Sequence, residues 1–216
     1  MKPQPSILRY FKDVAKKSLA GQKGVSLIMV MLIMVVVSML GISGVQISMM
    51  AERGARNDRD IQIAFQAAEA ALLDAEFDIN SKASSARASK PFHKDNVFIE
   101  GTFPQDCGNS GDSVGLCKKN DEGQVPAWLD VDFTDTSTTA RTVEFGKFTG
   151  REFPVGTVGI QPSQKPRYII ELLKKKSAAE DASPYYRVTA MGFGSRPDIQ
   201  VILQTIYRYS DPEDLE

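Results

Sequence analysis

The stretch that decides the fold is residues 24–40, Gly24-Val-Ser-Leu-Ile-Met-Val-Met-Leu-Ile-Met-Val-Val-Val-Ser-Met-Leu40, and no charged side chain follows it before Glu52. About 20 apolar residues suffice for a helix to cross a hydrocarbon core about 30 Å thick. Six basic residues precede this stretch, against the single acid Asp13. Such a charge bias holds the N-terminus in the cytoplasm and sends the rest of the chain across the membrane. The sequence therefore predicts a single-pass membrane helix over residues 25–51, followed by an exported domain.

The apolar stretch is longer than that of a secretory signal peptide, which spans about 7–15 residues and ends at a small-residue cleavage site. Its small residue stands at the beginning instead, because Gly24 directly follows Lys23. A basic leader, a glycine and an uninterrupted apolar helix resemble the type III signal of type IV pilins. The resemblance implies that a prepilin peptidase removes residues 1–24 by cutting between Gly24 and Val25. A signal anchor that is never cleaved remains the alternative.

The residues after the membrane segment predict that the helix continues through residues 52–80. Ala, Glu, Gln and Leu dominate this region, and all four are strong helix formers. Its apolar positions recur every three or four residues, which indicates one face of an amphipathic helix. They are Ile61, Phe65, Ala68, Leu72, Ala75 and Ile79, of which we expect Ile61, Phe65, Ala68 and Leu72 to be the helix-packing positions. Three glycines, Gly41, Gly44 and Gly54, each weaken a helix by about 1 kcal/mol relative to alanine, so the junction is where the helix would stretch or melt.

Several short motifs make the resemblance to a known family specific. They are GVSLI at residues 24–28, AER at 51–53, NDRD at 57–60 and AFQAAEAAL at 64–72. Together they resemble the N-terminal region of PilX-type minor pilins, over roughly residues 21–77. Near the C-terminus, YRVTAMGFG and VILQTIYRY resemble the closing hairpin of the same proteins.

Position 29 departs from the general pilin pattern, in which the fifth residue after cleavage is Glu, whereas this chain has Met29. In the family picture, that Glu pairs inside the apolar helix bundle with the N-terminal amine of the subunit assembled before it. A lone carboxylate there is costly unless it is paired. A subunit without a predecessor has no amine to neutralise, so Met29 suits the first subunit, at the fibre tip. The alternative is that Met29 is tolerated because the protein is scarce and poorly incorporated.

The size and charge of the chain fit one exported domain. Without residues 1–24 the chain carries 20 Lys and Arg against 26 Asp and Glu, a net charge of −6. No basic patch follows the membrane helix, so nucleic-acid binding has no electrostatic support. Residues 81–216 are numerous enough to form one domain with its own core.

The second half of the exported domain predicts a sheet. Residues 101–166 are rich in Gly, Pro, Asp, Ser and Thr and predict loops, whereas residues 168–173, 186–191 and 199–207 predict strands. Turn residues at 192–198 favour an antiparallel connection between the last two strands. We therefore predict an α+β fold, the pilin-like ladle, in which a long N-terminal helix packs on a C-terminal antiparallel sheet.

The chain has two cysteines, Cys107 and Cys117, in a loop rich in Gly and Asn. In an oxidising periplasm the pair is expected to form a disulfide that closes a small loop, worth about 3 kcal/mol by the chain-entropy estimate. Free thiols are the alternative. A metal site would need more ligands, and the single histidine, His93, lies outside the loop.

No catalytic constellation is evident. A Cys–His pair with His93 would lose its nucleophile to the disulfide. The acidic residues between positions 106 and 135 do not follow the twelve-residue pattern of a calcium loop. Trp128 and Phe133 are expected to be core or interface aromatics. The sequence therefore predicts a protein that is not an enzyme and that needs no cofactor or metal.

The resemblance implies a minor pilin that primes type IV pilus assembly in the bacterial inner membrane and lies at or near the tip of the extracellular pilus. Its implied partners are other minor pilins, the major pilin, the prepilin peptidase and the inner-membrane assembly platform. A K-type pseudopilin of type II secretion remains an alternative, and loss of twitching motility rather than of secreted enzymes would separate the two. The other alternative is an anchored periplasmic binding or adhesion domain that never polymerises. The sequence names neither a receptor nor the neighbouring pilin.

Overall fold

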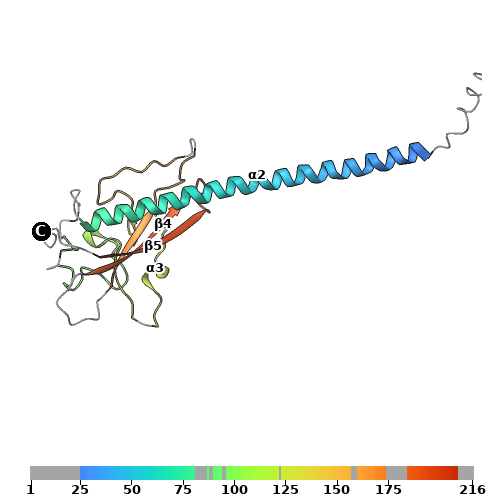
Figure 1. The fold of residues 1–216 in the computed structure, drawn as a ribbon. Coiled ribbons are helices and arrows are strands. Elements are labelled where there is room, and N and C mark those ends of the chain that lie inside the picture. The colour runs from blue at the N-terminus through green and yellow to red at the C-terminus, as the bar shows by residue number, and fades with distance from the viewer. Residues whose placement is uncertain are drawn as a thin grey trace, which may run out of the picture. The chain divides into compact units, whose positions relative to one another are not determined.

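The computed structural model of the chain describes residues 25–80, 87, 90–93, 96–121, 123–156, 160–173 and 184–208. The chain divides into two compact units, residues 1–55 and residues 56–216. One helix, α2 (Val25–Asn80), belongs to both units, and every other helix and strand among the described residues belongs to the second (Figure 1).

The helix α2 covers both ranges that the sequence predicts to be helical. The expected stretch or melt at the junction is not seen, because Gly41, Gly44 and Gly54 all lie within regular helix. No proline interrupts the 56 residues, and a methyl group at any of these glycines would meet open space. The cost of three helical glycines is small beside the propensity of the alanine- and leucine-rich residues that follow them.

The sheet is mixed and mostly antiparallel. Its three long strands, β3 (Arg167–Leu173), β4 (Tyr185–Phe193) and β5 (Gln200–Arg208), pair antiparallel in sequence order, which confirms the predicted α+β fold. Two short strands were not predicted. They are β1 (Leu116–Lys118), which pairs parallel to β3, and β2 (Val143–Glu144), which pairs antiparallel to β3.

One face of the sheet is covered by the second half of α2 (Figure 1). The core between them combines small helix residues with large strand residues, so that the helix backbone comes close to the sheet. From the helix it contains Ala71, Ala75 and Ile79, and from β3 and β4 it contains Tyr168, Ile170, Tyr186, Val188 and Ala190.

The opposite face of the sheet is covered by Cys107, Ala127, Trp128, Val131 and Phe133, from a region that the sequence predicted as loops. The same region contains the 3-10 turn η2 (Gly111–Ser113) and the short helix α3 (Ala127–Asp130), while β1 between them is a strand of the sheet itself. Phe133 is buried and Trp128 packs against the same cluster, as predicted for these two aromatics. The cluster reaches β3 and β4 through Ile169, Met191 and Phe193.

Candidate functional site

The contact between α2 and β4 is made by small residues. Ala64, Ala67 and Ala68 are buried to at least 99 % of their surface, and Gly192 of β4 lies directly opposite them. A methyl group built on Gly192 would collide with the backbone carbonyl oxygen of Ala64 and the backbone nitrogen of Ala68. The two backbones are therefore in direct contact, and the position excludes every residue except glycine.

Of the four residues predicted to be helix-packing positions, two lie in the contact with the sheet and two are exposed. Ala68 is fully buried and Leu72 packs partly buried against the core, whereas Ile61 and Phe65 are each 43 % exposed. Ile61 and Phe65 therefore lie outside the buried contact with the sheet, and their role in helix packing stays a prediction. The helix instead turns its alanines toward the sheet, because only small side chains allow this close approach.

Two aspartates lie on the buried helix face and were missed by the sequence analysis. The carboxylate of Asp78 is fully buried and accepts hydrogen bonds from Arg87 Nε at 2.9 Å to both oxygens. The hydroxyl of Tyr168 also donates to Asp78 at 3.2 Å, and Arg87 Nη1 donates to the carbonyl oxygens of Asp112 and Val114. The Asp78–Arg87 pair thus joins the end of α2 to β3 and to the loop that precedes β1.

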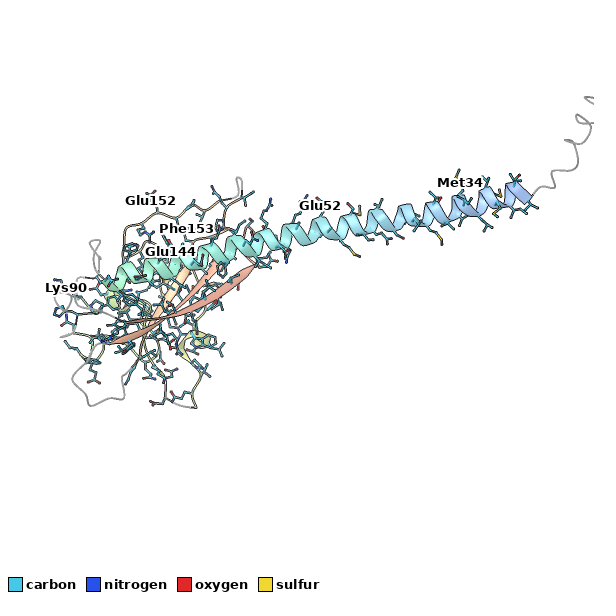
Figure 2. The ribbon with its side chains drawn as sticks, viewed as in Figure 1. Met34, Glu52, Lys90, Glu144, Glu152 and Phe153 are labelled. Carbon is cyan, nitrogen blue, oxygen red and sulfur yellow. A yellow bond between two sulfur atoms is a disulfide. The ribbon has the colours of Figure 1, made fainter. Side chains whose placement is uncertain are left out.

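Asp74 fixes a second segment, residues 144–156. Its carboxylate accepts hydrogen bonds from the backbone N–H of Gly146 and the hydroxyl of Thr149, and Arg151 lies 3.8 Å away. Arg151 also stacks over Phe77, 4.7 Å from the ring centre. Figure 2 shows Glu152 and Phe153 of this segment on the other side of α2 from β4 and β5. The helix is therefore held on two sides.

Burial raises the pKa of Asp74 above its ordinary value, against hydrogen bonds from Gly146 and Thr149 that lower it. A raised pKa in the folded state means that the protonated carboxyl favours folding. This contribution is fully present below the unfolded-state pKa of about 4 and is lost as pH rises through the folded-state pKa.

The sequence contains a pattern that could have placed these two acids on the buried helix face. Asp74 and Asp78 are four residues apart and share a helix face with Ala67, Ala71 and Ala75. Two acids among alanines fit either a solvated helix face or a buried face on which each acid has a polar or cationic partner. The cation partners come from distant segments, so sequence spacing could not identify them.

The predicted disulfide is confirmed. Cys107 and Cys117 are bonded, with an S–S distance of 2.05 Å, and both are buried in the cluster that covers the second face of the sheet. Cys117 lies in β1, beside Glu171 of β3. The bond therefore ties the covering segment to the sheet.

The first unit carries the apolar surface that the sequence assigned to a membrane. The helix α2 is long and apolar enough to cross a membrane, and none of its most apolar window is buried. Val25 is its first residue, and Met29 is 60 % exposed on it. Gly24 lies outside the described residues. Such an apolar helix surface is suited to a bilayer or to packing with other helices.

The described part of the chain offers little for catalysis. It contains no group of three His, Cys, Asp or Glu side chains that could hold a metal ion. A hollow of about 330 Å³ is lined by the hydroxyls of residues 136–142 and by Lys165 and Arg167. Both of these cations lie beside Glu144, at 2.8 and 3.6 Å, so much of their charge is balanced within the protein.

Two family models match the chain. Residues 23–73 match the model for the PilX N-terminal region, and residues 113–209 match the model for the C-terminal region of the type IV pilus assembly protein PilX. The first match covers most of α2, and the second extends from η2 to the end of β5. None of the curated proteins or solved structures compared with the chain matches it.

Proposed function

The chain belongs to the PilX family of type IV pilus assembly proteins, and from this we propose that it is a minor pilin that primes the fibre in the inner membrane. The observation that carries the proposal is the pair of family matches, which together cover most of α2 and the C-terminal sheet. The exposed apolar surface of α2 supports it, since such a surface is suited to lateral packing with other helices in a bilayer.

The proposed organisation follows from the order of the segments. Residues 1–24 are the leader, residues 25–51 cross the inner membrane, residues 52–80 continue the helix and residues 81–216 form the periplasmic domain. The N-terminus stays in the cytoplasm because its basic residues precede the apolar span. The subunit then leaves the membrane with its helix when it enters a growing fibre.

The proposed position is the first one in the fibre, at or near the tip. Met29 supports this position, because a methionine cannot neutralise the amine of an earlier subunit within the apolar bundle. The proposed partners are other minor pilins, the major pilin, the prepilin peptidase and the assembly platform. The family is a structural one, and we assign no catalytic activity or cofactor to the chain.

The first prediction tests the processing step. Gly24→Val is expected to leave a precursor that retains residues 1–24, because the glycine must enter a peptidase site with no room for a side chain. Mass spectrometry of the N-terminus measures this directly, and a mature wild-type chain should begin at an N-methylated Val25. Gly21→Val is the matched control and should be processed normally. Normal cleavage of the Gly24 variant would contradict the type III signal.

The second prediction tests the proposed priming role of the protein and its proposed position at the fibre tip. Deletion of the gene should reduce surface pili at least about tenfold while the major pilin remains in the membrane, because fewer fibres are primed. Met29→Glu should change pilus number little, since a carboxylate that faces no amine can take up a proton. Gold-labelled antibody against the exported domain should mark pilus ends or the basal membrane. Regular labelling along the shaft would contradict the tip position, and unchanged pilus number on deletion would contradict priming.

A further inference from the structure

The strand β5 forms one edge of the sheet. The strand order is β1-β3-β4-β5, and no described strand pairs with the outer side of β5. In an edge strand, alternate residues direct their backbone N–H and C=O groups away from the sheet. This edge therefore presents a row of backbone hydrogen-bonding groups to its surroundings.

β5 lacks the features by which monomeric proteins protect such edges. Natural edge strands are short, contain proline or charged side chains, or are twisted by bulges. β5 has nine residues, contains no proline and pairs residue for residue with β4 without a bulge. Its single charged residue, Arg208, is its last one. A long and regular edge of this kind is a template for another strand.

One face of β5 carries two exposed isoleucines, which alternate with Gln200 and Gln204. Ile202 is 46 % exposed and Ile206 is 66 % exposed, although both lie on the face that the cluster of Ala127, Val131 and Phe133 covers over β3 and β4. The cluster that covers this face over β3 and β4 includes no residue of β5, so the two isoleucines are left exposed at the edge of the sheet.

The other face of β5 borders an apolar groove against α2. The groove has a volume of about 390 Å³ and is lined by Leu72, Leu73, Val188, Thr205 and Tyr207. Leu73 is 52 % exposed within it. Two acids of the helix, Glu69 and Glu76, also line the groove. Apolar surface thus flanks the open edge on both sides of the sheet, and the groove carries negative charge.

We propose that β5 is a docking edge, and that an extended segment of a different pilus subunit adds to it as a further strand. Alternate aliphatic side chains of this segment fill the groove beside Leu73 and cover Ile202 and Ile206 on the opposite face. A basic residue of the segment faces Glu69 and Glu76. A second copy of this chain fits less well, since pairing of two β5 strands would bring together two acidic grooves. The proposal rests on the proposed function in that the partner is a pilus subunit.

The first test is photocrosslinking in cells that contain the complete pilus machinery. A benzophenone amino acid is placed at Ile206 of the full chain and, as a matched control, at Leu129, which is 63 % exposed on α3. Position 206 should give adducts with another pilus subunit at least about tenfold more often than position 129. Equal yields would overturn the docking edge, and adducts between two copies of this chain would overturn the choice of partner.

The second test is substitution. Ile206→Lys should lower pilus number at least about tenfold, because a charge within the strand–strand contact opposes pairing. The double change of Glu69 and Glu76 to lysine should do the same by repelling the basic segment, whereas Leu129→Lys and Glu152→Lys should assemble pili normally. An intact Cys107–Cys117 disulfide and normal protease resistance show that each variant is folded. Wild-type pili in the Ile206 variant, in cells where deletion abolishes pili, would overturn the docking edge alone. Unchanged pili on deletion would instead overturn priming, and the crosslinks would still report on the edge.

Discussion

Adding one methyl group to Gly192 is expected to destabilise the second unit, residues 56–216, by about 3 kcal/mol, the upper end of the usual cost of overpacking. Alanine is otherwise the better strand residue, since glycine loses more conformational freedom on folding. Gly192→Ala is nevertheless expected to lower the stability, because the new methyl would meet backbone atoms of Ala64 and Ala68 that cannot rotate away. The helix must move back from the sheet, and that movement opens the core behind Ala71 and Ala75.

Thermal unfolding of the full chain in detergent measures this effect. Gly54→Ala is the matched control, because a methyl at Gly54 meets no atom within 4 Å and should stabilise the helix by about 1 kcal/mol. Replacing glycine by alanine should therefore lower the free energy of unfolding at Gly192 and raise it at Gly54. A Gly192→Ala variant as stable as the wild type would show that α2 does not lie this close to β4.

The second large effect is expected at the buried ion pair. Asp78→Asn keeps the shape of the side chain but leaves the Arg87 guanidinium without its buried counter-charge, and the expected loss of stability is about 3–5 kcal/mol. Tyr168 would also lose a charged acceptor for its hydroxyl. Replacing both Asp78 and Arg87 by apolar residues of similar volume should recover much of the loss, because no unpaired charge then remains buried.

The exposed pair of Asp130 and Arg141 provides the control for this prediction. Its atoms are 3.0 Å apart, but the two side chains are 53 % and 34 % exposed. Asp130→Asn should therefore cost no more than about 1 kcal/mol. Equal losses for the two variants, measured by chemical unfolding of the full chain, would show that the Asp78–Arg87 pair is not buried in solution.

The features predicted correctly from the sequence depend on local patterns. Residues 25–80 form the predicted long helix, and its first part is long and apolar enough to cross a membrane, since length and hydropathy depend only on its own side chains. The three long strands follow from β-branched and aromatic residues bounded by turn residues. The Cys107–Cys117 disulfide follows because a chain with two cysteines allows a single intramolecular pairing.

The face that α2 turns toward the sheet was decided only by tertiary structure. Hydrophobic periodicity placed Ile61 and Phe65 on the packing face of the helix. The close backbone contact at Gly192 instead leaves room only for alanines between the helix and the sheet. Asp74 and Asp78 could be buried because Thr149, Arg87 and the backbone of Gly146 reach them from distant parts of the chain. The parallel pairing of β1 with β3 and the open edge of β5 are likewise properties of how segments assemble. A residue's own neighbours determine its propensity and hydropathy, whereas close approach, charge compensation and strand order depend on which distant segments share the same space.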